Sequence, residues 1–195
     1  MDMQGKMLFA PITACIVVLF LLLSRPFEVS AGSAGSTGKV PEAGMVLAPF
    51  ELPSPAGDGD IAYLGLKSPT FQLKDIDCQV LLVEIIGVYC PYCYNQAPLF
   101  NKLFARLNKK GMGDKVKMLA IAAGGTSNEV EHLRKSGQYE LPVVKDELFA
   151  VHKLLGEPRT PFTMLLDREG KVLYTHFGII EDMDAFYQQL LALVK

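Results

Sequence analysis

The feature that most constrains the fold is an apolar segment that leads into two closely spaced cysteines. Residues 80–86 (VLLVEII) are apolar apart from one glutamate and rich in β-branched side chains, as expected of a strand covered on both faces. Cys90 and Cys93 follow, and residues 91–110 then carry leucines at helical spacing. The cysteine pair therefore lies where a buried strand ends and a helix begins.

Strand and helix patterns alternate from there to the end of the chain. Further strands are predicted at 115–123, 141–146, 162–167 and 171–178, and further helices at 127–137, 147–156 and 181–194. We expect Ser127 or Asn128 to cap the first of these helices. Upstream, residues 61–66 and 70–73 have the pattern of a short hairpin. The order predicts an α/β fold, in which helices flank a central mixed β-sheet that carries an N-terminal β-hairpin extension.

The N-terminal segment has the features of an export signal. Residues 8–23 form an uncharged apolar run of 16 residues, whereas a transmembrane helix usually needs about 20. Residues 29–31 (VSA) supply small side chains at the spacing of a signal-peptidase site. We expect a signal peptide at 1–31, cleaved near Ala31, with an uncleaved membrane anchor as the alternative. A linker rich in Gly, Ser and Pro is predicted at 32–44, followed by one folded domain at 45–195.

Charge and cysteine content narrow the function. The net charge of −2 and the pI near 5.9 argue against nucleic-acid binding, which usually shows a basic stripe. Export would place the chain where disulfides form and persist. The exported part keeps three cysteines, Cys78, Cys90 and Cys93, so that one stays unpaired if two join.

The position of the cysteine pair at a helix start favours redox chemistry. Cys90 precedes Pro91, which is tolerated at the first helical position because its missing N–H would be unpaired there anyway. Unpaired N–H groups and the helix dipole favour a thiolate at Cys90 and lower its pKa. Cys90 is therefore the expected nucleophile. Cys93, three residues further on, faces inwards and can attack a mixed disulfide.

Two other roles fit the pair less well. A zinc site would need about four Cys or His ligands, but His132, His152 and His176 stand isolated in the sequence and there is no second C-x-x-C. A structural disulfide between Cys90 and Cys93 would close a very short loop and contribute little stability. We therefore expect no metal, and no cofactor beyond the redox-active Cys90–Cys93 disulfide.

Motifs further along the chain add to the specificity of the pair. The segment 160–163 (TPFT) precedes an apolar strand, DREGKV and Gly178 follow it, and Pro98 lies inside the helix after the cysteines. Together with APFELP, VLLVEII and GVYCPYC, these segments resemble the thioredoxin-like superfamily over about residues 45–195. The resemblance is strongest to its exported TlpA-like branch, which is related to the redoxins (the AhpC-TSA group).

The resemblance implies roles for the residues around the pair. Pro161 is expected to be a cis-proline packed against the cysteines and, with Thr160, to pair its backbone with an incoming polypeptide. Glu84 is expected to be a buried proton acceptor for Cys93, the alternative being a solvated carboxylate at the sheet margin. The remaining expected substrate-binding residues flank the cysteines: Tyr89, Pro91 and Tyr92.

Some residues depart from the family pattern. Many TlpA-like proteins carry a glutamate three residues after the second cysteine, whereas this chain has Gln96, which cannot act as a base. Tyr89 replaces the usual tryptophan, and the Pro-Tyr dipeptide between the cysteines is that of glutaredoxins. Because that dipeptide helps to set the redox potential, it leaves the direction of electron flow open. Cys78 lacks a helix N-terminus to activate it and is expected to be a packed or half-exposed thiol, and not a catalytic one.

The resemblance implies an exported thiol–disulfide oxidoreductase, favoured as a reductase, in the periplasm and either soluble or anchored to the inner membrane. Secreted or periplasmic thiol proteins are the expected partners, together with a membrane electron donor, and nucleic acid is not expected. One alternative is a thiol peroxidase of the redoxin class, although IIGVYC lacks the Pro-x-x-x-(T/S) stretch that precedes a peroxidatic cysteine. The other is a redox-inactive binding module that uses the groove beside Pro161.

Overall fold

The structure, a computed structural model, describes Met1 and residues 38–194. Residues 2–37 lie outside the described part, and with them the predicted signal peptide and the first half of the predicted linker. Among the described residues, no helix is both long enough and apolar enough to cross a membrane.

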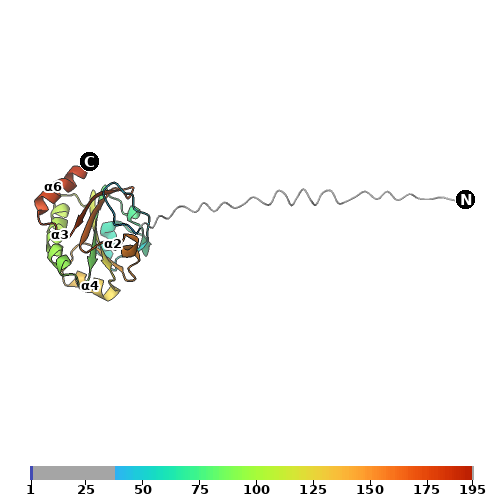
Figure 1. Cartoon of the computed structure of the whole chain (residues 1–195), viewed down its shortest axis with the longest axis horizontal. Helices are drawn as coiled ribbons and strands as arrows, with labels where there is room; N and C mark the ends of the chain where they lie inside the picture. Colours follow the sequence, from blue (N-terminus) through green and yellow to red (C-terminus); the bar gives the residue numbers. More distant parts are fainter. Residues whose placement is uncertain (2–37, 195) are drawn as a thin grey trace. The chain divides into compact units, whose positions relative to one another are not determined.

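A five-stranded sheet forms the centre of the domain (Figure 1). Its strands are, in spatial order, β5 (Val143–Asp146), β4 (Val116–Ala123), β3 (Val80–Gly87), β6 (Phe162–Leu166) and β7 (Val172–Phe177). β3, β4 and β5 run parallel, whereas β6 is antiparallel to β3 and β7 to β6. The predicted mixed sheet is therefore confirmed. The apolar segment of the sequence becomes the central strand β3, where both faces are covered.

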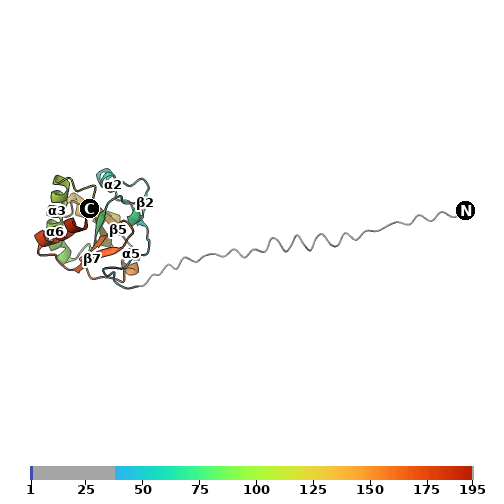
Figure 2. The same cartoon turned by 90° about the horizontal axis from the view of Figure 1, so that it is seen from above.

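Helices cover both faces of this sheet (Figure 1, Figure 2). α3 (Pro91–Lys109) and α6 (Met183–Leu193) pack on one face, and α2 (Asp58–Leu64) and α5 (Ala150–Leu154) pack on the other. The remaining helical elements of the described residues are α4 (Ser127–Lys135) and a short 3-10 helix, η2 (Leu73–Asp75). From β3 to α6, the order of strands and helices is the one predicted from the sequence.

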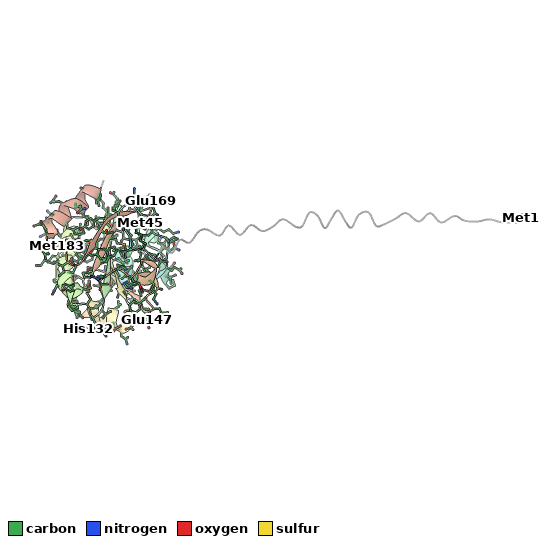
Figure 3. The ribbon with its side chains drawn as sticks, in the orientation of Figure 1. Met1, Met45, His132, Glu147, Glu169 and Met183 are labelled. Carbon is green, nitrogen blue, oxygen red and sulfur yellow. The ribbon has the colours of Figure 1, made fainter. Side chains whose placement is uncertain are left out.

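Alternation along β3 divides the core into two layers. Leu82 and Ile86 point towards α3 and pack with Phe100, whereas Val83 and Ile85 point towards the α2 face. Burial of each such side chain contributes about 1.5–3 kcal/mol. Side chains fill the space on both sides of the sheet (Figure 3). By the same alternation, the single glutamate of β3 shares the face that α3 covers.

Residues 61–66 do not form the predicted strand, because they lie in α2 and the turn that ends it. Two aspartates stand in the first turn of α2, where the helix dipole favours negative charge, and Gly65 ends the helix with a φ of 72°. Ile61 and Leu64, three residues apart, both face the core. The N-terminal hairpin is formed instead by β1 (Leu52–Pro53) and β2 (Thr70–Phe71), which pair antiparallel on either side of α2 in the sequence.

The cap of α4 differs by one residue from the prediction. It is Thr126, and not Ser127 or Asn128. The hydroxyl of Thr126 accepts the N–H of Glu129 at 3.4 Å, and the Glu129 carboxylate accepts the N–H of Thr126 at 2.8 Å. This reciprocal pair satisfies two of the N–H groups that a helix start leaves unpaired.

Residues 38–44 fall in the predicted linker, yet they contact the domain. The N–H of Gly44 donates to the carbonyl of Val172 at 2.8 Å, and Val40 packs against the core layer on the α2 face. Gly156 makes room for this segment, because a Cβ there would lie 2.6 Å from the backbone nitrogen of Val40. The folded region therefore begins upstream of residue 45.

Candidate active site

The candidate active site lies at the edge of the sheet where β3 ends. β3 runs to Gly87, and Cys90 is the N-cap of α3. Because β6 is antiparallel to β3, the residues that precede β6 lie at this same edge. Thr160 and Pro161 are thereby brought to Cys90 across a sequence separation of 70 residues.

Cys90 is the accessible cysteine of the pair and the more acidic one. Its Sγ accepts the N–H of Cys93 at 3.2 Å and donates to the carbonyl of Thr160 at 3.5 Å. Partial burial raises the pKa of Cys90, but hydrogen bonds with Cys93, Thr160 and the N–H of Tyr92 lower it by more, and the net shift of the pKa is downwards. The helix start thus favours the thiolate form of Cys90.

Cys93 has the opposite environment. Its side chain is only 2% exposed, and burial, followed by the hydrogen bond with the Cys90 thiol, raises the pKa of Cys93. The two sulfurs therefore differ in both exposure and acidity. An attacking sulfur has to be accessible and ionised, whereas a resolving sulfur acts only after a mixed disulfide has formed. The geometry suits Cys90 to the first role and Cys93 to the second.

Glu84 is buried on β3, within electrostatic reach of Cys90. Its exposed fraction is 0%, and neither carboxyl oxygen has a hydrogen-bond partner among the described residues. The alternative position at a solvated sheet margin is therefore contradicted. Burial, and then the nearby charge of Cys90, raise the pKa of Glu84 well above its ordinary value. A carboxyl whose pKa is raised in this way is a stronger base than an ordinary one and is suited to accept a proton.

The Thr160–Pro161 peptide bond is cis, as predicted. Pro161 is buried, and its carbonyl accepts the N–H of Gly178, just after β7, at 2.8 Å. Thr160 is half-buried, and its carbonyl is the group that Cys90 Sγ contacts. The backbone that precedes β6 thus lies beside the nucleophilic sulfur.

The other three residues predicted to bind substrate are exposed. Tyr89 and Tyr92 have exposed fractions of 81% and 64%, and Pro91 is exposed at the first position of α3. The hydroxyl of Tyr89 donates to the carboxylate of Glu129 on α4, which lowers the pKa of Glu129 to about 2. This hydrogen bond ties the Tyr89 ring to the N-terminus of α4 at one side of the cysteines.

Gly87, which the sequence pattern did not single out, lies next to both Cys90 at the start of α3 and Thr160 in the loop before β6. A Cβ at this position would meet the Cβ of Cys90 at 3.3 Å and the Oγ1 of Thr160 at 3.4 Å. Glycine therefore allows the start of α3 and the loop that carries Thr160 and Pro161 (the proline loop) to approach each other closely. A glycine at the end of a predicted strand was the one signal in the sequence.

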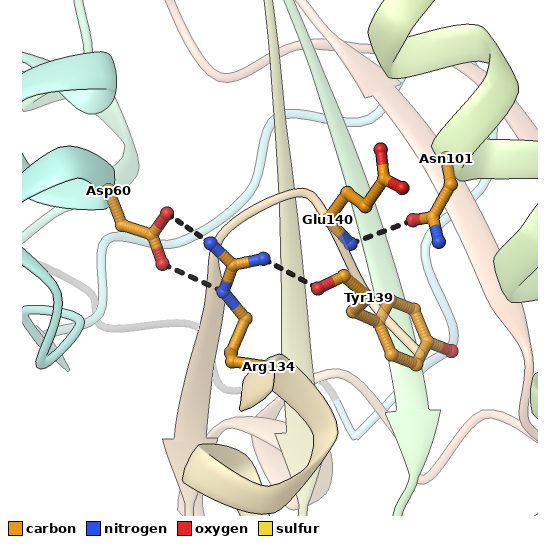
Figure 4. Close-up of polar contacts among 5 residues, drawn as sticks. All are labelled: Asp60, Asn101, Arg134, Tyr139 and Glu140. Carbon is orange, nitrogen blue, oxygen red and sulfur yellow. Dashed lines mark hydrogen bonds and ion pairs between the residues drawn. The ribbon is translucent and has the colours of Figure 1, made fainter. Parts of the chain in front are cut away.

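Tyr139 also escaped prediction. It is buried, and its hydroxyl donates to the carbonyl of Cys93 at 3.3 Å. Arg134 donates to the carbonyl of Tyr139 and forms an ion pair with Asp60 of α2 (Figure 4). The N–H of Glu140, the residue after Tyr139, donates to the Oδ1 of Asn101 on α3 at 2.8 Å. In the sequence, Tyr139 is only an aromatic residue in a polar loop. That pattern does not predict its hydrogen bond to Cys93, because the residues that hold it in place come from distant elements.

Gln96 and Cys78 are both buried. The Oε1 of Gln96 accepts the N–H of Ile180 at 2.7 Å, which ties α3 to the loop after β7. The thiol of Cys78 donates to the carbonyl of Ile76 at 3.7 Å, and burial raises the pKa of Cys78 to about 11. Cys78 is therefore a packed, unactivated thiol, as predicted.

The reactive groups at the site are two thiols and a carboxyl, and the described residues form no metal centre. His152 and His176 contact the backbone carbonyls of Pro158 and Ile179 at 3.0 and 3.1 Å. Within residues 38–194, no three His, Cys, Asp or Glu side chains gather as metal ligands would. That the protein needs no cofactor beyond the cysteine pair stays a prediction.

Comparison with known proteins places this site in a family. The family model described as Redoxin matches residues 55–190, which include both cysteines and the cis peptide bond. The chain belongs to the redoxin family.

The curated relatives of this redoxin include thiol-disulfide oxidoreductases. ResA of Bacillus thuringiensis subsp. konkukian (strain 97-27) is 27% identical over 108 residues, which are 55% of this redoxin and 60% of the relative. ResA of Halalkalibacterium halodurans is 23% identical over 127 residues, which are 65% of this redoxin and 70% of the relative. The match to the first of these spans less than two thirds of that relative's length.

Solved structures share the fold of this redoxin. A putative thiol:disulfide interchange protein DsbE from Chlorobium tepidum has a TM-score of 0.62 at 24% identity, over 79% of this chain and 99% of that one. StoA from Bacillus subtilis has a TM-score of 0.56 at 18% identity, over 74% of this chain and 98% of that one. These similarities confirm the thioredoxin-like fold.

Proposed function

We propose that this redoxin is a thiol–disulfide oxidoreductase that exchanges disulfides with protein substrates through Cys90 and Cys93. The observation that carries the proposal is the contrast between the two sulfurs. Cys90 is half-exposed and its pKa is lowered, whereas Cys93 is buried and its pKa is raised. Relatives that are named thiol-disulfide oxidoreductases support it.

In the reducing direction, the Cys90 thiolate attacks one sulfur of a substrate disulfide. A bond forms between Cys90 Sγ and that sulfur, the substrate S–S bond breaks, and the other sulfur leaves as a thiolate. Cys93 then gives up its proton and attacks Cys90 Sγ, which releases the second substrate thiolate. The substrate gains two electrons and, from solvent, as many protons as the two cysteines have lost. Cys90 and Cys93 end the cycle as a disulfide.

Glu84 takes the proton of Cys93 in the second step. Burial raises the pKa values of both groups, so that each binds a proton more tightly than usual. Glu84 is therefore a better proton acceptor for Cys93 than a carboxylate of ordinary pKa would be. The carboxylate form of Glu84 is the base, and its protonated form returns the proton in the oxidising direction.

Substrate binds over the backbone and the aromatic rings beside Cys90. Thr160 and Pro161 supply the main chain that pairs with an extended polypeptide, and their position beside Cys90 Sγ supports this role. Tyr89, Pro91 and Tyr92 supply the exposed surface on the helix side. We expect no cofactor other than the cysteine pair.

The expected substrates are secreted or periplasmic thiol proteins, and the expected electron donor is a membrane protein. The basis for this part of the proposal is the export signal predicted at 1–31, since disulfides persist outside the cytosol. Cleavage near Ala31 would give a soluble periplasmic protein, and retention of the segment would give one anchored to the inner membrane. A reductase is the favoured direction.

The midpoint potential of the Cys90–Cys93 pair tests the proposal. Full-length protein carrying Cys15→Ala and Cys78→Ala is equilibrated in thiol/disulfide buffers, and free thiols are counted by alkylation gel shifts because the chain has no tryptophan. We expect one two-electron transition, and a potential below that of the glutathione couple identifies a reductase. The absence of a reversible transition, or its persistence in Cys90→Ser, would exclude oxidoreductase activity.

A further inference from the structure

Three buried polar side chains on the α3 face of the sheet have atoms without partners. Glu84, Gln96 and Thr163 each have an exposed fraction of 0%. Both carboxyl oxygens of Glu84, the Nε2 of Gln96 and the Oγ1 of Thr163 make no hydrogen bond within the described part of the chain. Buried polar groups in proteins are nearly always paired, either with protein atoms or with ordered water. If these three groups lie together, one bound water can serve as their common partner.

The register of the sheet brings two of these side chains side by side. Glu84 of β3 lies directly opposite Thr163 of β6, and Thr163 lies opposite His176 of β7. Directly opposed residues point to the same face, with Cβ atoms about 4.5–5.5 Å apart. The next opposed pair along β6 and β7 on this face, Leu165 and Tyr174, packs in the core layer under α3. The row Glu84, Thr163, His176 therefore faces α3 as well.

The third side chain, Gln96, lies on α3, the helix that covers this face of the sheet. Gln96 follows Cys93 by three residues on α3, and its Oε1 accepts the N–H of Ile180. The ring of His176 contacts the carbonyl of Ile179, the preceding residue, at 3.1 Å. Gln96 and His176 thus contact neighbouring residues of the loop after β7. Of the four polar side chains, His176 is half-buried and the other three have no exposed surface.

We propose that Glu84, Gln96 and Thr163 bind ordered water beneath Cys93, and that this water and His176 carry protons between Glu84 and solvent. The proposal rests on the proposed function, in which Glu84 takes the proton of Cys93. The chemistry of the three groups fits water: the Gln96 amide donates, a carboxylate accepts, and the Thr163 hydroxyl does both. A buried water typically makes about three hydrogen bonds of this kind.

The proposed route returns Glu84 to the carboxylate form in which it started. After the exchange reaction, Glu84 holds the proton that Cys93 gave up. Its O–H bond breaks as the proton passes to the bound water, which passes a proton on towards His176. Because the Ile179 carbonyl can only accept, the Nε2 of His176 donates to it, and Nδ1 is the nitrogen that takes the proton. His176 then releases a proton to solvent, and Glu84 returns to the carboxylate form.

Other titratable groups near this row are the two cysteines, Tyr139, and Tyr174 of β7, whose ring lies beside that of His176 on the same face of the sheet. Cys90 and Cys93 stand at the start of α3, and Tyr139 precedes β5. The pKa of Tyr139 is raised by burial and then by Glu84, which places the two side chains within electrostatic reach. Replacing the β6 and β7 members of the row therefore tests the proposed route while these four groups stay in place.

The first test compares Thr163→Val with Thr175→Val in the full-length reduced protein. Thr175 lies opposite Met164 on the other face of the sheet, so that its loss controls for the loss of a β-sheet threonine. Glu84 is titrated by ¹³C NMR of its carboxyl carbon. Thr163→Val should raise the pKa of Glu84 by about one unit, because the carboxylate loses a water-mediated hydrogen bond. Thr163→Ser, which keeps the hydroxyl, and Thr175→Val should titrate like the wild type, and a wild-type curve for Thr163→Val would overturn the water site.

The second test compares His176→Phe with His152→Phe. The two histidines are closely matched, since each is half-buried, contacts a backbone carbonyl and lies beside an aromatic ring. The release of a thiol from a mixed disulfide at Cys90 is followed in weakly buffered solution. His176→Phe should slow this release about tenfold, and added imidazole should restore the rate. Equal rates in the two variants would overturn the role of His176.

Glu84→Gln distinguishes the failure of this inference from the failure of the proposed function. If Glu84→Gln leaves the release rate and its pH profile unchanged, the proton role of Glu84 is wrong, and the water route is wrong with it. If Glu84→Gln slows release while Thr163→Val and His176→Phe behave like their controls, the water route alone is wrong.

Discussion

The two faces of the sheet bury polar groups in different ways. On the α2 face, the carboxylate of Asp146 accepts the N–H groups of Val151 and His152 at 3.1 and 2.8 Å. Lys117, only 9% exposed, pairs with Asp114 at 3.7 Å. These groups have the partners that a buried charge needs, and they hold α5 and the start of β4 in place.

On the α3 face, the buried polar groups beneath the cysteines have unused hydrogen-bonding capacity. Glu84 has no hydrogen-bond partner among the described residues, and burial raises its pKa. N–H donors stabilise the charged form of a carboxyl, whereas desolvation favours its protonated form. The comparison indicates that the α2 face pairs its buried polar groups, whereas the α3 face leaves several of them without partners among the described residues.

The sharpest test of this comparison is the pair Glu84→Gln and Asp146→Asn. Glutamine cannot take the proton of Cys93, so the release of substrate thiol should fall about 100-fold at neutral pH, with stability unchanged or increased. Asp146→Asn should lower the free energy of unfolding by about 1.5–3 kcal/mol, because it weakens two charge-assisted hydrogen bonds, and should leave the rate within about twofold. Stopped-flow kinetics and urea unfolding measure the two effects. A rate loss in Asp146→Asn with none in Glu84→Gln would reverse the roles of the faces.

The pH dependence of stability should reveal the buried carboxyl of the α3 face independently of activity. Because the pKa of Glu84 is raised in the folded state, the folded protein binds this proton more tightly than the unfolded chain does. The resulting stability is fully present below the ordinary pKa of 4.5 and is lost as the pH rises through the folded pKa. Thermal unfolding between about pH 4 and about pH 8 should therefore show the wild type declining relative to Glu84→Gln. A constant difference between the two curves would mean that Glu84 does not titrate in this way.

Two tyrosines on opposite faces offer a comparison of smaller effect. The hydroxyl of Tyr139 donates to the carbonyl of Cys93, and the hydroxyl of Tyr63 on α2 accepts the N–H of Met118 at 3.0 Å. Replacement of either by phenylalanine should cost about 1 kcal/mol of stability. Only Tyr139→Phe should also change the alkylation rate of Cys93, because it loosens the first turn of α3. An equal change in both variants would show that the effect is general destabilisation.

The smallest expected effect concerns two glycines. Alanine at Gly87 would press on Cys90 and Thr160, and should slow the attack by Cys90 about three- to tenfold by shifting the sulfur from the proline loop. A Cβ at Gly59 in α2 would meet nothing within 4 Å, so Gly59→Ala should leave the rate unchanged and stabilise α2 by up to about 1 kcal/mol. Alkylation of Cys90 and thermal unfolding report the two outcomes. A normal alkylation rate in Gly87→Ala would show that the site tolerates the extra methyl group.

Local patterns in the sequence determined much of the fold and the centre of the site. The apolar run of β3, the helix start at Cys90 and the alternation of elements from β3 to α6 are properties of short segments, in which spacing and side-chain type decide the structure. The same local reasoning failed at 61–66, where residues with strand-like composition form α2 between two aspartates and Gly65. It also failed at 38–44, because a polar, glycine-containing segment gives no sign of the surface on which it packs.

Only the tertiary structure decided what surrounds the cysteines. Whether Glu84 was buried or solvated depended on α3 covering its face of the sheet, and its position opposite Thr163 depended on the register between β3 and β6. Tyr139 reaches Cys93 through a loop that α2 and α4 hold in place. A sequence states which residues can desolvate a carboxyl or support a thiol. Their distances are set by how strands and helices far apart in the chain pack, and those distances determine the pKa values of the site.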